Sequence, residues 1–144
     1  MRNAIVLATR FGTPKLNALV GVVPEGVTDE QAQATPVANL NSVAPLAGDA
    51  GITLLVEAIN NVDIPRYWAS TVAEAVSLVE TVNHPSVRLQ LDQYHAAMAG
   101  EDAIACLRKY FPLVAHIQIA DVRAGTNQAP GRSPSARFST KWIA

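Results

Sequence analysis

The fold of this chain is decided by one stretch, residues 51–95, which reads "GITLLVEAINNVDIPRYWASTVAEAVSLVETVNHPSVRLQLDQYH". It begins with an apolar run typical of a buried strand and closes with a second predicted strand, "SVRLQLDQYH". Between the runs, apolar residues recur at helical spacing over residues 72–79, behind a Ser70 or Thr71 helix cap. A strand, a helix and a strand with short connections predict a right-handed crossover between parallel strands.

The same alternation continues toward the N-terminus. The sequence predicts a helix over residues 2–12 and a strand over residues 15–23. The next segment, residues 28–51, opens with a capping-box pattern, but Pro36 and Pro45 predict breaks or kinks in its helix.

Toward the C-terminus, the pattern predicts a helix over residues 100–114 and a fourth strand over residues 115–121. No GxGxxG or Walker loop follows any of the four strands, which argues against a nucleotide-binding doubly wound sheet. The predicted fold class is therefore α/β, a partial TIM (β/α)8 barrel of about four parallel strands with flanking helices. A complete barrel typically needs about 250 residues, so four strands are about half of one.

Bulk composition limits the function classes open to the chain. Its 144 residues are 49% hydrophobic and 16% charged, which is enough apolar content for one domain with a core. A formal net charge of −1 argues against general binding of nucleic acid or of an anionic membrane. No run reaches the ~18 apolar residues of a membrane span, and the N-terminus lacks a signal-peptide pattern. We therefore expect a cytoplasmic protein, in which the lone Cys106 is a core residue.

Polar residues stand at the carboxyl ends of three successive strands: Glu57, Asp92 and Gln118. Because side chains alternate along a strand, all three fall on one face, which in a barrel points inward near the catalytic end. The opposite face carries the aliphatic residues that we expect under the helices: Ile52, Leu54, Val56, Leu89, Leu91, Ile117 and Ile119. Two carboxylates and an amide oxygen suit Mg²⁺ or Mn²⁺ better than a thiolate-bound zinc ion. Each residue taken alone could equally be a polar strand end that caps the next helix.

Further polar residues follow the second and third strands. If the third strand ends near Asp92, His95 lies in the next loop, where it could reach a substrate oxygen, ligate a metal or have no special role. Asn60 and Asp63 stand just past the second strand and either line the pocket or form the turn before Pro65.

Four motifs carry a resemblance to a known family: "LNALVGVVPEG", "GITLLVEAINNVDIPRY", "VRLQLDQYH" and "HIQIAD". Over about residues 2–122 the chain resembles the hydroxypyruvate isomerase family, within the xylose isomerase-like TIM barrel superfamily. The resemblance implies a TIM barrel that interconverts hydroxypyruvate and tartronate semialdehyde, or a related keto/aldehyde pair of sugar acids. It also implies two glutamates that shuttle the proton, and a divalent metal held by carboxylates and a glutamine.

The resemblance implies roles for individual residues. Glu57 matches a catalytic glutamate that also binds the metal, and Asp92 and Gln118 match metal ligands. His95 matches a substrate-contacting histidine, and we place Asn60 beside it at the substrate. We therefore expect Mg²⁺ or Mn²⁺ as cofactor and a small sugar acid as substrate, with no nucleic-acid or membrane partner.

The chain departs from the family pattern at both ends. The family's first three strands, and its eighth strand with the second glutamate, have no counterpart here. We therefore expect residues 1–122 to form a partial, catalytically incomplete barrel whose open edges favour a homo-oligomer.

Residues 123–144 read "RAGTNQAPGRSPSARFSTKWIA" and lack apolar periodicity. Synonymous codons can be chosen for them that, in another reading frame, translate as "PGRHEPGTGEIAFGSVFNEMDR". This is the loop and helix start that the family has at this point, and most bases of the choice are fixed by the amino acids. We therefore expect residues 123–144 to be an irregular, out-of-frame tail of an isomerase gene.

Two other functions remain open. A metal-dependent endonuclease of the same superfamily, acting on abasic DNA, would need more ligands and a basic groove, so three His and a net charge of −1 disfavour it. A non-catalytic remnant could instead persist by self-association through its open edges. The flanking DNA would separate a misread gene from a true truncation.

Overall fold

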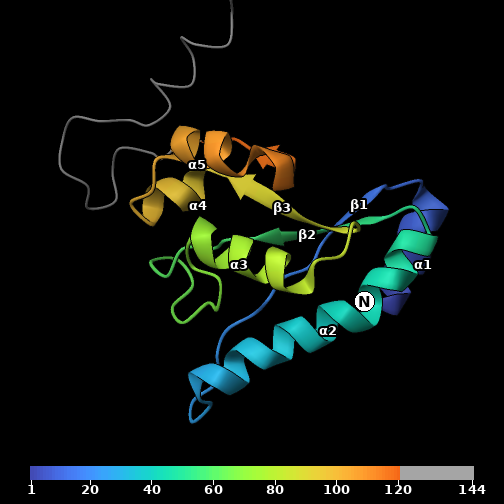
Figure 1. The fold of residues 1–144 in the computed structure, drawn as a ribbon, viewed down its shortest axis with the longest axis horizontal. Coiled ribbons are helices and arrows are strands. Elements are labelled where there is room, and N and C mark those ends of the chain that lie inside the picture. The colour runs from blue at the N-terminus through green and yellow to red at the C-terminus, as the bar shows by residue number, and fades with distance from the viewer. Residues whose placement is uncertain (121–144) are drawn as a thin grey trace, which may run out of the picture.

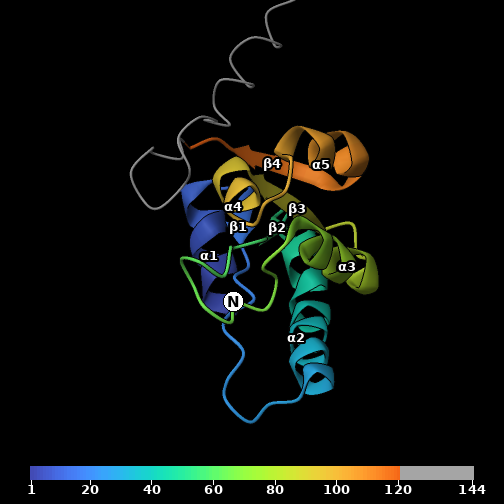
Figure 2. The same cartoon turned by 90° about the vertical axis from the view of Figure 1, so that its left-hand side faces the viewer.

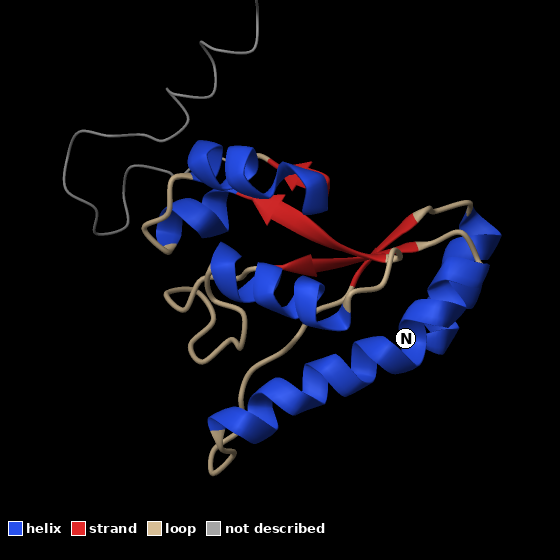
Figure 3. Ribbon diagram, viewed as in Figure 1, coloured by secondary structure: helices blue, strands red, loops and turns tan. Residues whose placement is uncertain are grey.

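The computed structural model describes residues 1–120, a parallel four-stranded sheet with helices between its strands (Figures 1 and 3). The elements in chain order are α1 (Arg2–Phe11), β1 (Lys15–Asn17), α2 (Asp29–Asp49), β2 (Thr53–Glu57), α3 (Val72–Val82), β3 (Val87–Asp92), α4 (Gln93–Met98), α5 (Ala103–Tyr110), η1 (Phe111–Leu113) and β4 (Val114–Gln118). The strand order is β1-β2-β3-β4, and every neighbouring pair is parallel. The predicted α/β class, with four parallel strands forming a half-barrel, is confirmed.

The sheet is curved rather than flat. The Lys15 side chain on β1 donates a 2.7 Å hydrogen bond to the Ala115 carbonyl on β4, although β2 and β3 lie between these strands. In a flat sheet three strand spacings would separate the two strands by about 14 Å, which is beyond the reach of a lysine side chain. Curvature of this kind turns one face of the sheet inward and brings its side chains together.

The core lies between the other face of the sheet and the helices, and Figure 2 shows α2 and α3 side by side along it. The predicted aliphatic row is buried from the second strand to the third: Ile52, Leu54, Val56, Leu89 and Leu91 are each at most 3% exposed. Helix α3 starts at a capping box in which the Thr71 hydroxyl accepts from the Glu74 backbone N–H. Burial of this row fixes which face of each strand points toward the site.

Two residues of the same row differ from the prediction. Ile117 is 38% exposed and Ile119 is 67% exposed, so the expectation that they pack under a helix is wrong. The reason is that β4 is an edge strand, and no helix within residues 1–120 follows it to cover this face. Two apolar side chains therefore lie exposed, Ile117 on β4 and Ile119 just beyond its end.

Helix α2 runs unbroken through Pro36 and Pro45, so of the predicted breaks or kinks the breaks are wrong, while Figure 1 shows the helix bending toward its C-terminal end. Each proline removes one main-chain hydrogen bond, yet packing can hold a helix that its own propensity would interrupt. The side of α2 that faces the core supplies this packing: Pro36, Leu40, Ala44 and Ala47 are buried.

Two element boundaries also differ from the sequence prediction. The strand expected over residues 15–23 is only three residues long, and beyond it Val22 forms a single antiparallel bridge to Tyr67. The helix expected over residues 100–114 begins after the Asp102 cap and ends as the 3-10 turn η1.

The expected boundary at Val122 and the irregular tail predicted for residues 123–144 lie outside the described residues. Among helices within residues 1–120, none is both long and apolar enough to cross a membrane.

Candidate active site

Three parallel strands end in polar residues at the same edge of the sheet. β2 ends at Glu57, β3 at Asp92 and β4 at Gln118. In the register of the sheet Glu57 pairs with Gln90, and Asp92 pairs with Gln118. The residues expected to hold a metal therefore stand on neighbouring strands at the carboxyl-terminal edge, where barrels of this class carry their sites.

Glu57 is a buried carboxylate, 6% exposed, with one oxygen already bound. Its Oε2 accepts a 2.5 Å hydrogen bond from Nδ2 of Asn17 on β1. Its Oε1 accepts no hydrogen bond from residues 1–120. Within this part of the chain Oε1 is therefore the oxygen that can take a proton or bind a cation.

Asp92 divides its two oxygens between the fold and the site. Oδ1 accepts hydrogen bonds from the backbone N–H of Tyr94 at 2.7 Å and of His95 at 3.3 Å, which makes Asp92 the N-cap of α4. Oδ2 accepts no hydrogen bond within the described part of the chain. Because the cap starts a helix, His95 lies in the first turn of α4, and its predicted loop position is wrong.

Glu57, Asp92 and His95 each bring one potential ligand atom into a cluster whose atoms all lie within 4.8 Å of one another. Hard divalent cations sit about 2.0–2.6 Å from their oxygen ligands, so two ligands of one ion stand at most about 5 Å apart. The cluster is therefore compact enough to share one ion. A cation would also offset the repulsion between two carboxylates held this close together.

Gln118 lies next to Asp92 in the sheet and is bound to a second glutamine. Its Oε1 accepts a 2.5 Å hydrogen bond from Nε2 of Gln90, a buried residue of β3. An amide oxygen has two lone pairs, so this bond leaves one of them available to a cation. The chemistry of Gln118 therefore fits the ligand role that the sequence suggested.

Asn60 is completely buried and uses all of its hydrogen-bonding groups. Its Oδ1 accepts from the backbone N–H of Val62 at 3.0 Å and of Asp63 at 2.9 Å. Its Nδ2 donates to Asp63 Oδ2 at 3.0 Å and lies 2.7 Å from Nδ1 of His95. Asn60 therefore has no free group for the substrate contact expected from the sequence. It belongs instead to the turn before Pro65, which was the alternative expectation.

Asp63 and Tyr94 extend this network outward. The hydrogen bond from Asn60, and then the one from Tyr94, hold the pKa of the Asp63 carboxyl below its ordinary value of 3.8. The bond to Asp63 in turn raises the pKa of Tyr94 above 10.0. The rings of Tyr94 and His95 meet edge to face, with their centroids 5.2 Å apart. Tyr94, Asp63, Asn60 and His95 thus form one connected chain of contacts.

Sequence reasoning missed Asn17, Gln90 and Tyr94 as supporting residues. Strand parity places Gln90 on the inward face, but its partner depends on the register between β3 and β4. That register shifts at an irregularity between Leu89 and Gln90. No periodicity in the sequence predicts this shift. The Asn17 contact likewise depends on how β1 pairs with β2, where Asn17 stands opposite Leu55.

Comparison with known proteins bears on this half-barrel and its site. Residues 1–135 match the family model of the xylose isomerase-like TIM barrel. The chain belongs to this family. A putative hydroxypyruvate isomerase of Xenopus laevis is 32% identical over an alignment of 127 residues that covers 85% of this chain and 46% of the relative. The hydroxypyruvate isomerase of Escherichia coli (strain K12) is 34% identical over 118 residues, which are 82% of this chain and 46% of the relative.

A solved structure gives the same result for the fold. The crystal structure of an AP endonuclease, family 2, from Brucella melitensis matches with a TM-score of 0.78 and 30% identity, over 96% of this chain and 55% of that one. The chain therefore spans about half the length of the curated relatives that it matches. The family resemblance inferred from the sequence motifs is confirmed.

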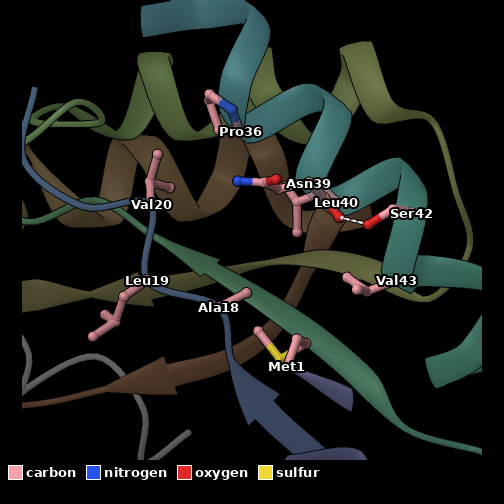
Figure 4. Close-up of a pocket in the computed structure, with 9 residues that line it drawn as sticks. All are labelled: Met1, Ala18, Leu19, Val20, Pro36, Asn39, Leu40, Ser42 and Val43. Carbon is pink, nitrogen blue, oxygen red and sulfur yellow. Dashed lines mark hydrogen bonds between the residues drawn. The ribbon is translucent and has the colours of Figure 1, made fainter.

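The cavity drawn in Figure 4 shares none of its lining residues with the site of this xylose isomerase-like barrel. It has a volume of about 350 Å³ and lies between α2 and the segment that follows β1. Its lining holds no titratable side chain: Met1, Ala18, Leu19, Val20, Pro36, Asn39, Leu40, Ser42 and Val43. The groups able to move a proton stand instead at the carboxyl-terminal edge of the strands.

Proposed function

We propose that the chain is part of a hydroxypyruvate isomerase-like enzyme, in which a divalent cation assists the keto/aldehyde isomerisation of a small sugar acid. The observation that carries this is the cluster of Glu57, Asp92 and His95 within 4.8 Å, in a chain about a third identical to hydroxypyruvate isomerases. In this proposal Glu57 is the proton-transferring base, and Mg²⁺ or Mn²⁺ is held by Glu57, Asp92 and Gln118.

The reaction moves one hydrogen between adjacent carbons. The Glu57 carboxylate takes a proton from C3 of hydroxypyruvate, the C–H electron pair forms a C2–C3 double bond, and the C2 oxygen takes up the negative charge. The C3 hydroxyl proton then passes to the C2 oxygen, and a proton returns to C2. The product is tartronate semialdehyde, and no atom or electron is lost.

The residues around Glu57 suit this step. The hydrogen bond from Asn17 to Oε2 fixes the carboxylate, and Oε1, which has no partner within residues 1–120, is the oxygen that acts. A divalent cation held by the neighbouring oxygens would polarise the carbonyl and stabilise the negative charge on the C2 oxygen. His95 lies close enough to Glu57 and Asp92 to contact the substrate oxygen that the cation would polarise.

We propose further that the 144-residue chain alone is catalytically incomplete. The family resemblance implies two glutamates, and only Glu57 has a counterpart here. One carboxylate can remove the proton from C3 and return it to the same carbon, whereas in the two-glutamate arrangement that the resemblance implies the second glutamate delivers the proton to C2. We therefore expect proton exchange at C3 without net isomerisation.

Deuterium exchange tests this proposal directly. In D₂O with Mg²⁺, the chain should replace the C3 hydrogens of hydroxypyruvate with deuterium faster than buffer does, as followed by proton NMR. Glu57→Gln should slow the catalysed exchange about 100-fold or more, because it removes the base. Glu80→Gln makes the same charge change on the exposed side of α3 and should leave the rate unchanged. Equal exchange in the wild type and Glu57→Gln would exclude Glu57 as the base.

The similarity to an AP endonuclease, family 2, is the observation behind a second candidate, a metal-dependent phosphodiesterase that acts on abasic DNA. A net charge of −1 provides little attraction for a phosphate backbone. Incubation with an abasic duplex and Mg²⁺ or Mn²⁺ should leave the strand intact. Strand cleavage that disappears in Glu57→Gln would favour the endonuclease instead.

A further inference from the structure

We propose that Asn60 is a positioning residue that keeps the His95 proton on Nε2, so that His95 donates a hydrogen bond into the site and does not ligate the cation. This inference rests on the proposed function only for the identity of the substrate oxygen to which His95 donates. The position of the proton follows from which atoms of Asn60 and His95 can donate a hydrogen bond and which can accept one.

The orientation of the Asn60 amide is fixed by the backbone. Two main-chain N–H groups, those of Val62 and Asp63, point at Oδ1 from 3.0 and 2.9 Å. A donor requires an acceptor, so the atom at this position is the oxygen, and a flipped amide would set two N–H groups against an NH₂ group. The atom that faces His95 is therefore Nδ2, which has only hydrogens to offer.

Both hydrogens of Nδ2 have partners. One goes to Oδ2 of Asp63 at 3.0 Å, and the other points to Nδ1 of His95 at 2.7 Å. A hydrogen bond at the second contact requires Nδ1 to be unprotonated, because two N–H groups facing each other cannot bond. In a neutral imidazole the single proton is then on Nε2.

This assignment separates His95 from the cation ligands. A nitrogen binds a metal through a free lone pair, and the lone pair of Nδ1 is already engaged with Asn60 while Nε2 carries a proton. His95 therefore lies within 4.8 Å of the carboxylates as a donor beside the cation site. A donor held in this way can stabilise the negative charge that develops on a substrate oxygen.

The rest of the network holds Asn60 in place. Asn60 is fully buried, so water does not compete for its amide. Asp63 is itself anchored by Tyr94, and the hydrogen bonds from Asn60 and Tyr94 keep the Asp63 pKa low, so this carboxylate stays an acceptor. The polarity of the network thus runs in one direction, from Tyr94 and Asn60 as donors to Asp63 and His95 as acceptors.

Solid-state 15N NMR on sedimented wild-type chain tests the assignment, because it requires neither a small particle nor a monomer. We expect His95 to show an unprotonated Nδ1 and a protonated Nε2 at neutral pH, with the signal assigned by its loss in His95→Gln. His84 is an internal reference, since its Nδ1 also accepts a hydrogen bond, from the Ser86 backbone N–H at 3.2 Å. A protonated Nδ1 on His95 would overturn the inference.

A double variant reverses the polarity without changing the net charge. In Asn60→Asp/Asp63→Asn the pair keeps one amide and one carboxylate, but an acceptor now faces His95, so its proton should move to Nδ1. Asn61→Asp/Asp63→Asn carries the same charges and keeps Asn60, so His95 should stay as in the wild type. If the first variant leaves the His95 tautomer unchanged while remaining folded by circular dichroism, Asn60 does not set it. If that variant unfolds, the wild-type spectrum alone decides.

Zinc binding gives a second readout that is independent of activity. Addition of Zn²⁺ alone should leave the His95 nitrogen shifts of the wild type nearly unchanged, whereas in the double variant the freed Nε2 should bind the ion and shift. Direct ligation of Zn²⁺ by wild-type His95 would contradict the inference while leaving the isomerase proposal intact. Loss of deuterium exchange in Glu57→Gln tests that proposal separately.

Discussion

Tyr94 donates to a carboxylate whose ionisation the structure favours. The hydrogen bonds from Asn60 and Tyr94 lower the pKa of Asp63, so they add stability above pH 3.8 that is lost as the pH falls through the lowered value. The raised pKa of Tyr94 makes its share present below pH 10.0 and lost as the pH rises through the raised value. Tyr94→Phe should therefore raise the Asp63 pKa toward 3.8, as measured by carboxyl 13C NMR. Tyr110→Phe, whose ring contacts Lys109, should not change it.

The sequence predicted which residues lie at the site better than it predicted the hydrogen bonds between them. Glu57, Asp92 and Gln118 could be placed at one edge because strand parity and chain order are visible in the sequence. The role of Asn60 could not, because it depends on which of its atoms faces His95 across 35 positions of chain. Hydrogen-bond direction is a property of the folded arrangement, and no local pattern encodes it.

Helix α4 depends on a carboxylate that the site also needs. Asp92→Asn keeps an N-cap oxygen but removes the charge, so the thermal unfolding temperature should hardly change while Mn²⁺ affinity falls. The loss should be at least about tenfold, because even residues that merely support a metal ligand cost 10–100-fold. Asp92→Ala should lose the same affinity and also about 1 kcal/mol of stability with the cap. Circular dichroism melts and Mn²⁺ titration separate the two effects, and equal stability of both variants would show that the cap contributes little.

Helix α2 can be tested at its exposed proline. Pro45→Ala restores one main-chain hydrogen bond and loses no packing, so the free energy of unfolding should rise by about 1–2 kcal/mol. Urea unfolding measures the change. Pro36→Ala is the contrast, because Pro36 is buried and its replacement also removes core contacts. An unchanged stability in Pro45→Ala would mean that the surrounding turn has already adapted to the proline.

Across the whole molecule, the sequence predicted order and direction better than extent. Alternating strand and helix patterns identified four parallel strands in the right sequence, because apolar periodicity reflects burial. The same logic failed at β1, where only three residues pair, and at β4, where Ile119 is exposed. Whether an apolar residue is buried depends on the neighbouring elements, and the sequence of the strand alone does not specify them.

The exposed sheet edges predict the oligomeric state of the 144-residue chain. β1 and β4 each have one unpaired side within the described sheet, and apolar side chains are exposed near both, with Leu19 at 65% and Ile119 at 67%. Open parallel edges with apolar flanks favour pairing between chains, so light scattering should show a mass above the monomer that falls on dilution. Ile119→Lys should shift the distribution toward monomer, because a charge at the β4 edge opposes pairing. Val62→Lys, at an equally exposed position in a loop, should leave the mass unchanged. A monodisperse monomer at every concentration would mean that these edges are protected in solution.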